Sequence, residues 1–597
     1  MCGISAIYRF KSLLEEDKQR IKRMDDQMHY RGPDGDGFWS NDRCAMGQVR
    51  LSIIGLQNGK QPLFNRDKSI VLVCNGEIYN YVELKAKLLS EGAVFCSDTD
   101  TEVIIHLYER YGTDCLSKLR GVFAFCLFDK KKDFMFVARD RMGEEQLYYS
   151  EIPGGVIVST ELKAILKEYV AEPQLNVESL LAPIRFTGGI SPRDTFVDQI
   201  KRVQPGEMLL VNANGVKKKC YWQRIRTYDF EGTLQDAKKE TLRLMQEAVD
   251  IEMRSDVPVA VMLSGGIDSS AVAALAKQSG YEVHTITTGY TGSHSEDERA
   301  VARRFAKEQG FIYHELELSP EDYVNSFEEM TAYLDEPMTD STAIAQWAMF
   351  KRVKSLGFKV LLGGMGGDEL FYGYPAWNKL GDSLKLRREH ESLFPWKGRE
   401  KKLQWVKFVA HNLKWILHAG YPHKLEDKSY GWWIHDDYYR FVNDATLTLG
   451  GEIYQLADYK VYKGFPPCLL GKEIDVIYDD AINTVMTQAF LYLSDRLSMG
   501  NSLEVRSPLL DYKLVEHVMS LPLEFKYVKG RPKQFMKDVL SGIVPDYILY
   551  APKRGFTSPS HFIGNVAQHY DYKCFTSGYK FYNSVLADKI LSLLWKN

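Results

Sequence analysis

The chain has 597 residues, of which 45% are hydrophobic and 26% charged, and its formal net charge at pH 7 is −3. This length predicts roughly two to four domains, and the composition is that of a globular protein. The small net charge gives no electrostatic reason to expect nucleic acid or an anionic membrane surface as a partner. The apolar runs are all far shorter than the ~18 residues that suggest a membrane-spanning helix. We therefore expect small-molecule substrates, with no nucleic-acid partner and no membrane association.

The cysteines and the first residues indicate a cytoplasmic protein. Nine cysteines are scattered without a CxxC pair or regular spacing. Such a set is typical of reduced thiols and not of a disulfide framework or a zinc site. The chain begins MCGISAIYRF, where the apolar stretch is short and Arg9 interrupts it. This pattern does not fit a targeting peptide.

Residues 1–212 predict a layered α+β domain. Short strand-like runs occur at 69–81, 122–129, 134–140 and 154–160. Helical spacing appears between them, at 81–92 and 101–112, and each of these helices is predicted to end at a glycine. Strands joined by hairpin-like turns, with helices interspersed, favour helices packed on antiparallel sheets.

From residue 236 the order becomes helix, buried strand, helix. An apolar run at 257–263 predicts a continuous buried strand, and further strands follow at 283–289 and 359–364. This alternation favours an α/β domain with a doubly wound parallel sheet. Residues 376–450 are rich in tryptophan, lysine and arginine, and we interpret them as a helical insertion.

The clearest chemical motif is LSGGIDSS at 263–270, directly between a predicted strand and a predicted helix. Its glycines allow the backbone to approach a ligand closely, and free N–H groups at a helix N-terminus favour an anion. The Walker pattern is absent, so the loop is not that of a P-loop kinase or GTPase. SGGxDS resembles the pyrophosphate-binding loop of the ATP pyrophosphatases, which cleave ATP to AMP and pyrophosphate.

A second loop, GGMGGDELFYGY at 363–374, follows another predicted strand. Ligands of doubly wound sheets bind at the carboxyl ends of the strands, so both loops are expected at one site. Asp268 and Asp368 could then face the same phosphates and bind Mg²⁺, which prefers oxygen ligands.

The ordered motifs closely resemble those of glutamine-hydrolysing asparagine synthetases over nearly the whole chain. In order they are MCGI, RGPDGDG (31–37), VRLSIIG (49–55), QPLF (61–64), NGEIYNY (75–81), DTEVI (100–104), GVFAF (121–125), RDRMGEEQLYY (139–149), SGGIDSS, DEP (335–337), GGDELF (366–371), SMGNSLEVRSPLLD (498–511) and PKRGF (552–556). The resemblance implies a four-layer αββα glutaminase domain of the N-terminal-nucleophile type over 1–212, a linker over 213–235, and an ATP pyrophosphatase domain over 236–597.

The resemblance assigns glutamine hydrolysis to the first domain. Removal of Met1 would leave Cys2 with its own α-amino group, and an amine of pKa ~7.7–8.0 can act as the base for a thiol of pKa ~8.5. The matching residues are Cys2 as the nucleophile, Asn75 and Gly76 as the oxyanion hole, and Arg50, Glu77 and Asp100 as glutamine-binding groups, with Arg50 for the α-carboxylate. Asp100 has a second interpretation as the N-cap of the helix that follows it.

In the second domain, ATP would activate a carboxylate as an acyl-adenylate, and ammonia would displace AMP. The residues that match ATP-binding positions are Leu263, Ser264, Gly265, Gly266, Asp268, Ser269, Ser270, Thr288, Gly363 and Gly364. Asp268 and Asp368 match metal positions, and Lys553 matches a lysine that neutralises developing charge in the acyl-transfer step. Glu504 and Arg506 are interpreted as a structural ion pair. No pattern fixes the oligomeric state, for which we consider a homodimer.

Three positions depart from the family pattern. Met365 stands where the synthetase loop has a carboxylate, Gly363 stands where it opens with serine, and Thr342 falls near the place of an acceptor-binding arginine. Methionine can neither shuttle a proton nor hold a cation. Aspartate is therefore the acceptor by family default, and another carboxylate, such as a uronic-acid sugar or a natural-product acid, is the alternative. An inactive binding protein is disfavoured because Cys2 and Asn75 are both retained.

Overall fold

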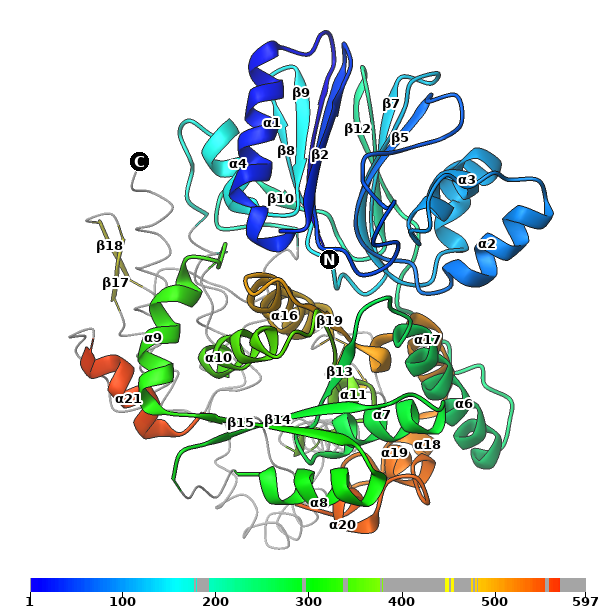
Figure 1. The fold of residues 1–597 in the computed structure, drawn as a ribbon, viewed down its shortest axis with the longest axis vertical. Coiled ribbons are helices and arrows are strands. Elements are labelled where there is room, and N and C mark those ends of the chain that lie inside the picture. The colour runs from blue at the N-terminus through cyan, green and yellow to red at the C-terminus, as the bar shows by residue number, and fades with distance from the viewer. Residues whose placement is uncertain are drawn as a thin grey trace, which may run out of the picture.

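The computed structural model describes residues 2–176, 179, 193–292, 297–336, 342–375, 378, 446–449, 452–455, 474–475, 478–479, 482–552 and 558–569. Two antiparallel six-stranded sheets form the N-terminal part, and a parallel five-stranded sheet forms the centre of the C-terminal part (Figure 1). None of the helices in these ranges is long and apolar enough to cross a membrane.

The two antiparallel sheets have buried central strands and more exposed edge strands. In spatial order, the first contains β10 (Lys201–Arg202), β8 (Tyr148–Ile152), β9 (Gly155–Ser159), β1 (Gly3–Arg9), β3 (Cys44–Arg50) and β2 (Gly35–Ser40). The second contains β12 (Gly215–Cys220), β11 (Glu207–Asn212), β7 (Phe134–Arg139), β6 (Val122–Asp129), β5 (Ile70–Glu77) and β4 (Leu63–Phe64).

The sheets pack face to face and are each covered by helices on the outside. Ile4, Ala6, Val71 and Val73 belong to the apolar core between the sheets. Helices α1 (Glu15–Gln27) and α4 (Leu162–Tyr169) share a core with the first sheet, whereas α2 (Tyr81–Ser90) and α3 (Glu102–Tyr111) share one with the second. Strands that are buried on both faces need nearly continuous apolar runs, and β6, with the sequence VFAFCLFD, has one. The predicted αββα layering is confirmed.

The C-terminal sheet is parallel throughout, as predicted. Its spatial order is β15 (Ile312–Leu318), β14 (His284–Tyr290), β13 (Val259–Met262), β16 (Val360–Leu362) and β19 (Glu504–Arg506). The chain builds outward from β13 on one side and returns to the other side with β16. The loops after β13 and β16 therefore flank the point where the strand order reverses, which is where doubly wound sheets bind ligands.

Helices cover both faces of this sheet. One face packs with α6 (Leu234–Glu252), α7 (Ile267–Gln278), α8 (Arg299–Gln309), α17 (Tyr512–Ser520), α19 (Gln534–Val539) and α20 (Asp546–Leu549). The other packs with α9 (Pro320–Thr331), α10 (Thr342–Ser355), α16 (Leu491–Met499) and α21 (Ser560–His569). Short helices α11 (Gly367–Leu370) and α18 (Leu523–Lys526) complete the described part.

Two details of the predicted organisation need correction. Strand β12 lies within the predicted linker 213–235 but pairs with β11, so the second sheet extends to Cys220 and the irregular connection covers 221–233. Most of the predicted helical insertion 376–450 lies outside the described residues. Its described end, β17 (Thr446–Leu449), is a strand that pairs with β18 (Glu452–Gln455). Here the β-branched residues Thr446, Thr448 and Ile453 favour a strand.

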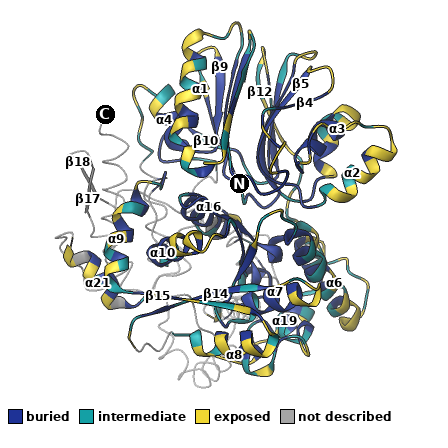
Figure 2. Cartoon of the chain, in the orientation of Figure 1, coloured by how far each residue is buried: buried dark blue, intermediate teal, exposed yellow. Residues whose placement is uncertain are grey.

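Charged residues join the two domains where they meet. Helix α16 lies against the N-terminal domain and is buried along its whole length, whereas the outer faces of α1 and α2 are exposed (Figure 2). Arg31 forms an ion pair with Asp495 of α16 at 2.6 Å, and Arg120 forms one with Asp511 at 2.7 Å. All four side chains are at most 3% exposed, so these pairs exclude water from the domain interface.

Candidate active sites

Cys2 lies directly before β1 and is 6% exposed. Its backbone N–H donates to Oδ1 of Asn75 on β5, and its carbonyl oxygen accepts from Nε of Arg31 at 2.9 Å. Burial raises the pKa of the Cys2 thiol, while the N–H of Leu51 and the guanidinium of Arg50 act in the opposite direction. The packed sheets thus bring together Cys2 and Asn75, which are 73 positions apart in sequence.

The Asn75 amide connects Cys2 to an acidic residue that the sequence analysis did not assign. Nδ2 of Asn75 donates to the carboxylate of Glu145, which is fully buried. Burial is the main reason why the pKa of Glu145 rises to about 8. Glu145 lies in the motif RDRMGEEQLYY, which was the only sequence feature that could have indicated its place at this site.

Gly76 has a φ of +136°, and a Cβ there would lie 2.1 Å from the carbonyl oxygen of Val122. Only glycine fits this close approach between β5 and β6. The next residue, Glu77, is 5% exposed, and its Oε2 has no hydrogen-bond partner in the described part of the chain. Arg506 lies 3.9 Å from that oxygen, across the domain interface.

Asp100 lies beside Glu77 and does not cap α3, whose N-cap is Thr101. Oδ2 of Asp100 accepts the N–H of Ile78 at 2.6 Å. Burial raises the pKa of Asp100 to about 6, and burial together with Asp100 raises that of Glu77 well above its usual range. Two desolvated carboxyl groups at one place are suited to a cationic ligand group.

Arg50, at the end of β3, donates to the carbonyl oxygens of Ile54 and Gly55 at 3.0 and 2.8 Å. These bonds use a single nitrogen of the guanidinium. Arg50 also contributes to the electrostatic surroundings of the Cys2 thiol. The first group of predicted residues is therefore gathered at one site, at the ends of β3 and β5.

The loop after β13 is held by its own hydroxyl groups. The N–H of Ser264 donates to Oγ of Ser269 at 3.1 Å, and the two hydroxyl groups are 3.0 Å apart. Gly265 has a φ of +78°, and Gly266 is the N-cap of α7 without a side-chain cap bond. The Oγ of Ser270 is buried without a hydrogen-bond partner among the described residues. The first N–H groups of α7 thus face the loop, an arrangement that favours an anion.

The loop after β16 packs closely against this first loop. A Cβ on Gly364 would lie 2.7 Å from the backbone nitrogen of Ser269, and one on Gly367 would lie 2.1 Å from Oδ1 of Asp268. Gly363 donates its N–H to the carbonyl oxygen of Arg506 at 2.9 Å. Leu263 and Thr288 lie at the ends of the neighbouring strands β13 and β14, and the hydroxyl of Thr288 has no hydrogen-bond partner among the described residues.

A lysine that the sequence analysis missed joins the two predicted metal-binding carboxylates. Nζ of Lys533 lies 2.6 Å from Asp368 and also bonds to Asp268. Burial alone would lower the pKa of Lys533, but the two aspartates outweigh it and raise it. Lys533 stands in GRPKQF, which carries no recognised motif. The pairing shows that this point of the site attracts a cation.

The carboxylate oxygens at this site also fit Mg²⁺. Asp268 and Asp368 supply carboxylate oxygens, which this ion prefers. The described ranges contain no group of three or more histidine, cysteine, aspartate or glutamate residues that could hold a metal ion. Two carboxylates would therefore need phosphate oxygens and water to complete an octahedral shell.

The structure describes all but one of the remaining predicted residues. Lys553 lies outside the described residues. Met365 is partly buried and packs on the core around α7. Thr342 is the first residue of α10, where its hydroxyl accepts from Gln346. Glu504 and Arg506 form the predicted ion pair at 2.5 Å.

An αββα domain with a buried cysteine at residue 2, joined to a parallel sheet with two glycine-rich loops at its switch point, is the architecture of a two-domain amidotransferase. Residues 1–222 match the family model of the glutamine amidotransferase domain, and residues 240–595 match that of asparagine synthase. The chain therefore belongs to the glutamine-hydrolysing asparagine synthetase family, and it is a glutamine-dependent ligase.

Similar proteins carry more than one kind of name. Glutamine-hydrolyzing asparagine synthetase 1 of Bacillus subtilis is 30% identical over 590 residues, which cover 95% of this chain and 88% of that protein. Amidase chyE of Penicillium rubens is 28% identical over 618 residues, covering 94% and 89%. Amidase chry2 of Gibberella zeae is 30% identical over 611 residues, also covering 94% and 89%.

Proposed function

We propose that the protein forms an amide from glutamine, ATP and a carboxylate acceptor. Cys2 releases ammonia from glutamine in the first domain. The second domain transfers AMP from ATP to the acceptor carboxylate, and ammonia displaces the AMP. The observation that carries this proposal is the Asp268–Lys533–Asp368 cluster at the switch point of the parallel sheet, in a chain whose other domain buries a cysteine at residue 2.

The first half-reaction follows from the residues around Cys2. After removal of Met1, the free α-amine takes the thiol proton, and the thiolate attacks the glutamine side-chain amide. Asn75 and the N–H of Gly76 stabilise the oxyanion; one such donor contributes about 2.7–4 kcal/mol. Arg50 binds the α-carboxylate of glutamine. The buried carboxyl groups of Glu77 and Asp100 bind its α-ammonium group, which restores their ionised state.

The second half-reaction uses the paired loops. Leu263 to Ser270, Thr288, Gly363 and Gly364 surround ATP, with the phosphates at the N-terminus of α7. Asp268 and Asp368 would hold Mg²⁺, which would neutralise phosphate charge when bound. Lys533 binds the pyrophosphate oxygens, because its buried ammonium group lies beside Asp268 and Asp368 and can neutralise phosphate charge there. Lys553 stabilises the charge that develops when ammonia attacks.

The acceptor is aspartate by family default, and a different carboxylate is the second candidate. Met365 favours the second candidate, because it offers no proton-transfer group or charge beside the loop. The names of the two fungal amidases agree with acceptor diversity among similar proteins. Cytoplasmic location and a homodimeric state are further parts of the proposal.

Pyrophosphate release provides the test. The full-length protein is supplied with glutamine, ATP and Mg²⁺, together with aspartate or with a panel of sugar acids and other carboxylates. Pyrophosphate that appears only with one acid identifies the acceptor, and the absence of aspartate-dependent release excludes asparagine synthesis. Failure of every acid, together with no glutamine hydrolysis, would contradict the proposed function itself.

A further inference from the structure

The side-chain amide of Asn75 is held at both ends. Its Oδ1 accepts the backbone N–H of Cys2, and its Nδ2 donates to Oε2 of Glu145. Asn75 is fully buried and lies on the same face of β5 as Val71 and Val73, which pack between the two sheets. Both contacts are therefore shielded from water, and each fixes one end of the amide.

The orientation of this amide matters for a reaction at Cys2. An oxyanion accepts hydrogen bonds, and only Nδ2 of the Asn75 side chain can donate them. Among the described residues Nδ2 donates to Glu145 alone, so one of its two N–H bonds is used and the other is available to a ligand. If the amide turned over by about 180°, Oδ1 would replace Nδ2 and repel the oxyanion. The terminal torsion of asparagine has broad, roughly two-fold preferences, so contacts with neighbours decide the orientation.

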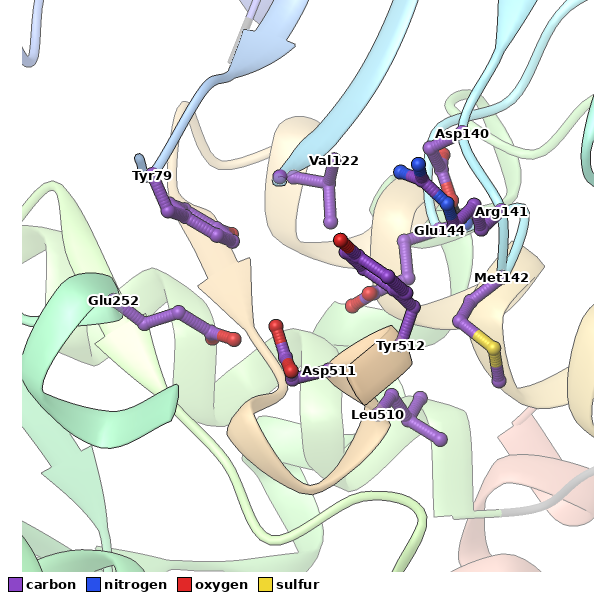
Figure 3. Close-up of a pocket in the computed structure, with 11 residues that line it drawn as sticks. Tyr79, Val122, Asp140, Arg141, Met142, Glu144, Glu252, Leu510, Asp511 and Tyr512 are labelled. Atoms are coloured by element: carbon purple, nitrogen blue, oxygen red, sulfur yellow. Dashed lines mark hydrogen bonds between the residues drawn. The ribbon is translucent and has the colours of Figure 1, made fainter. Parts of the chain in front are cut away.

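The loop after β7, residues 140–147, holds Glu145 in place. The N–H of Glu145 donates to Oδ2 of Asp140 at 2.9 Å, and its carbonyl oxygen accepts from Nε of Arg139. Asp140 in turn donates its own N–H to a carbonyl oxygen of β6 at 2.7 Å. The first residues of the loop line a small cavity beside Val122, at the start of β6 (Figure 3). The loop is thus fastened to the sheet that contains β5, which fixes the carboxyl group of Glu145 relative to that strand.

Fold stability does not account for the carboxyl group of Glu145. The group is fully buried, and its bond to Asn75 is the only hydrogen bond that it makes within the described part of the chain, where Oε1 has no partner. Burying a carboxyl group with so little compensation costs free energy. Burial is also the main reason why its pKa rises to about 8, so the group is mostly neutral at pH 7. What the side chain provides is one fixed acceptor for Asn75.

We propose that Glu145 is a positioning residue for glutamine hydrolysis at Cys2. It accepts one N–H of Asn75, and the other N–H of the same amide then donates to the oxyanion that forms when the Cys2 thiolate attacks. This inference rests on the proposed function, in which Asn75 is a donor of the oxyanion hole. It adds a residue that contacts neither glutamine nor the thiol and acts only through Asn75.

Glutamine hydrolysis by the full-length protein, measured without ATP, tests this role. Glu145→Met removes the acceptor and keeps a similar side-chain volume, so Asn75 loses its contact at Nδ2. We expect kcat to fall by about 10²-fold, near the lower limit for the loss of one oxyanion-hole donor. KM for glutamine should change by less than about threefold, because Glu145 does not contact the substrate. Glu145→Gln keeps an acceptor oxygen and should retain most of the activity.

Binding of the γ-aldehyde analogue of glutamine measures the oxyanion hole directly. When the Cys2 thiol adds to this aldehyde, a carbon–sulfur bond forms, the carbonyl π bond breaks, and the thiol proton passes to the former carbonyl oxygen. The tetrahedral adduct resembles the intermediate of hydrolysis, so its affinity follows the stabilisation of that oxygen. In Glu145→Met this affinity should fall by about the same factor as kcat. A purely structural defect would instead reduce the fraction of active protein and leave the affinity of the remainder unchanged.

A double-mutant cycle shows whether Glu145 acts through Asn75. Asn75→Ala removes the donor itself, and the combination of Asn75→Ala with Glu145→Met should be no slower than Asn75→Ala alone. The matched control is Asp25→Asn, which changes another buried carboxyl group of the same domain, one whose Oδ1 accepts from the hydroxyl of Ser5. This variant should retain both the kcat and the KM of the wild-type protein.

An unchanged kcat in Glu145→Met, equal losses in Glu145→Met and Glu145→Gln, or additive losses in the cycle would each overturn the inference. If Glu145→Met does not fold, Glu145→Asp takes its place with the same expectation, because its carboxyl group ends one methylene short of Asn75. Normal hydrolysis by the wild-type protein and by all Glu145 variants counts against this inference alone. A wild-type protein that neither hydrolyses glutamine nor binds the aldehyde would contradict the proposed function, and this inference with it.

Discussion

Arg31 of the glutaminase domain donates to both carboxylate oxygens of Asp495 in the synthetase domain, at 3.1 and 2.6 Å. The residues are 464 positions apart, and the same guanidinium holds the carbonyl oxygen of Cys2. Arg496, Glu161 and Asp335 extend this buried ionic cluster. The backbone of Cys2, the proposed nucleophile of one domain, is thus linked through Arg31 to a helix of the other domain.

Asp495→Ala is expected to destabilise the whole chain. The variant leaves Arg31 buried without its main carboxylate, and such losses cost about 3–5 kcal/mol. Urea unfolding measures the change, and glutamine hydrolysis should fall with it because the Cys2 backbone loses a fixed support. As a control, Glu16→Ala breaks exposed pairs with Arg20 and Arg23 and should change the stability much less. Equal losses in the two variants would show that the buried pair has no special role.

Cys2→Ala should lower the rate of glutamine-dependent amide formation by several orders of magnitude, since no other nucleophile is proposed. Amide formation from ammonium salts should continue, because the loops after β13 and β16 are untouched. Product formation with each nitrogen source, measured in parallel, distinguishes the two reactions. A similar loss with both sources would refute the division of work between the domains.

Lys533→Met should reduce pyrophosphate release by about 10²–10³-fold, the usual effect of removing one charge-stabilising group. Without the ammonium, Asp268 and Asp368 repel each other and the phosphates. Glutamine hydrolysis should persist. Lys537→Met is the matched control on α19, the short helix that Lys533 precedes as N-cap, because the Lys537 ammonium lies over the Tyr550 ring, 5.8 Å from its centre. Normal pyrophosphate release in Lys533→Met would remove Lys533 from the phosphate site.

Glu145 should make the protein less stable as the pH rises. Its pKa is about 8 in the folded chain, against about 4.3 for an ordinary glutamate. The folded state therefore binds this proton more tightly than the unfolded state, and stability is lost between about pH 4.3 and 8. Glu145→Gln should flatten this part of the profile in urea unfolding at several pH values. The exposed Glu231→Gln should leave the slope unchanged, and an unchanged slope in Glu145→Gln would be evidence against a protonated Glu145.

For Asp100, the local sequence allowed two interpretations. A helix N-cap and a ligand-binding carboxylate were both consistent with Asp100 before Thr101 and Glu102. The fold argues against the first, because Thr101 is the N-cap and the Asp100 carboxylate accepts from Ile78 on a different segment, whereas the second stays a prediction. That contact depends on how α3 packs on the second sheet, which the residues around position 100 do not specify.

Sequence by itself determined the layers of both domains and the two glycine-rich loops. Strand periodicity, helix periodicity and glycines at positive φ each depend on a few neighbouring residues, so the local sequence predicts these features. Only the tertiary structure decided that Lys533 meets Asp268 and Asp368, that Glu145 meets Asn75, and that Arg31 meets Asp495. These contacts join residues 70 to 464 positions apart. A charge that is buried without a partner costs much free energy, so the charges in a packed interior lie in pairs. Which charges become buried depends on how the sheets and domains pack.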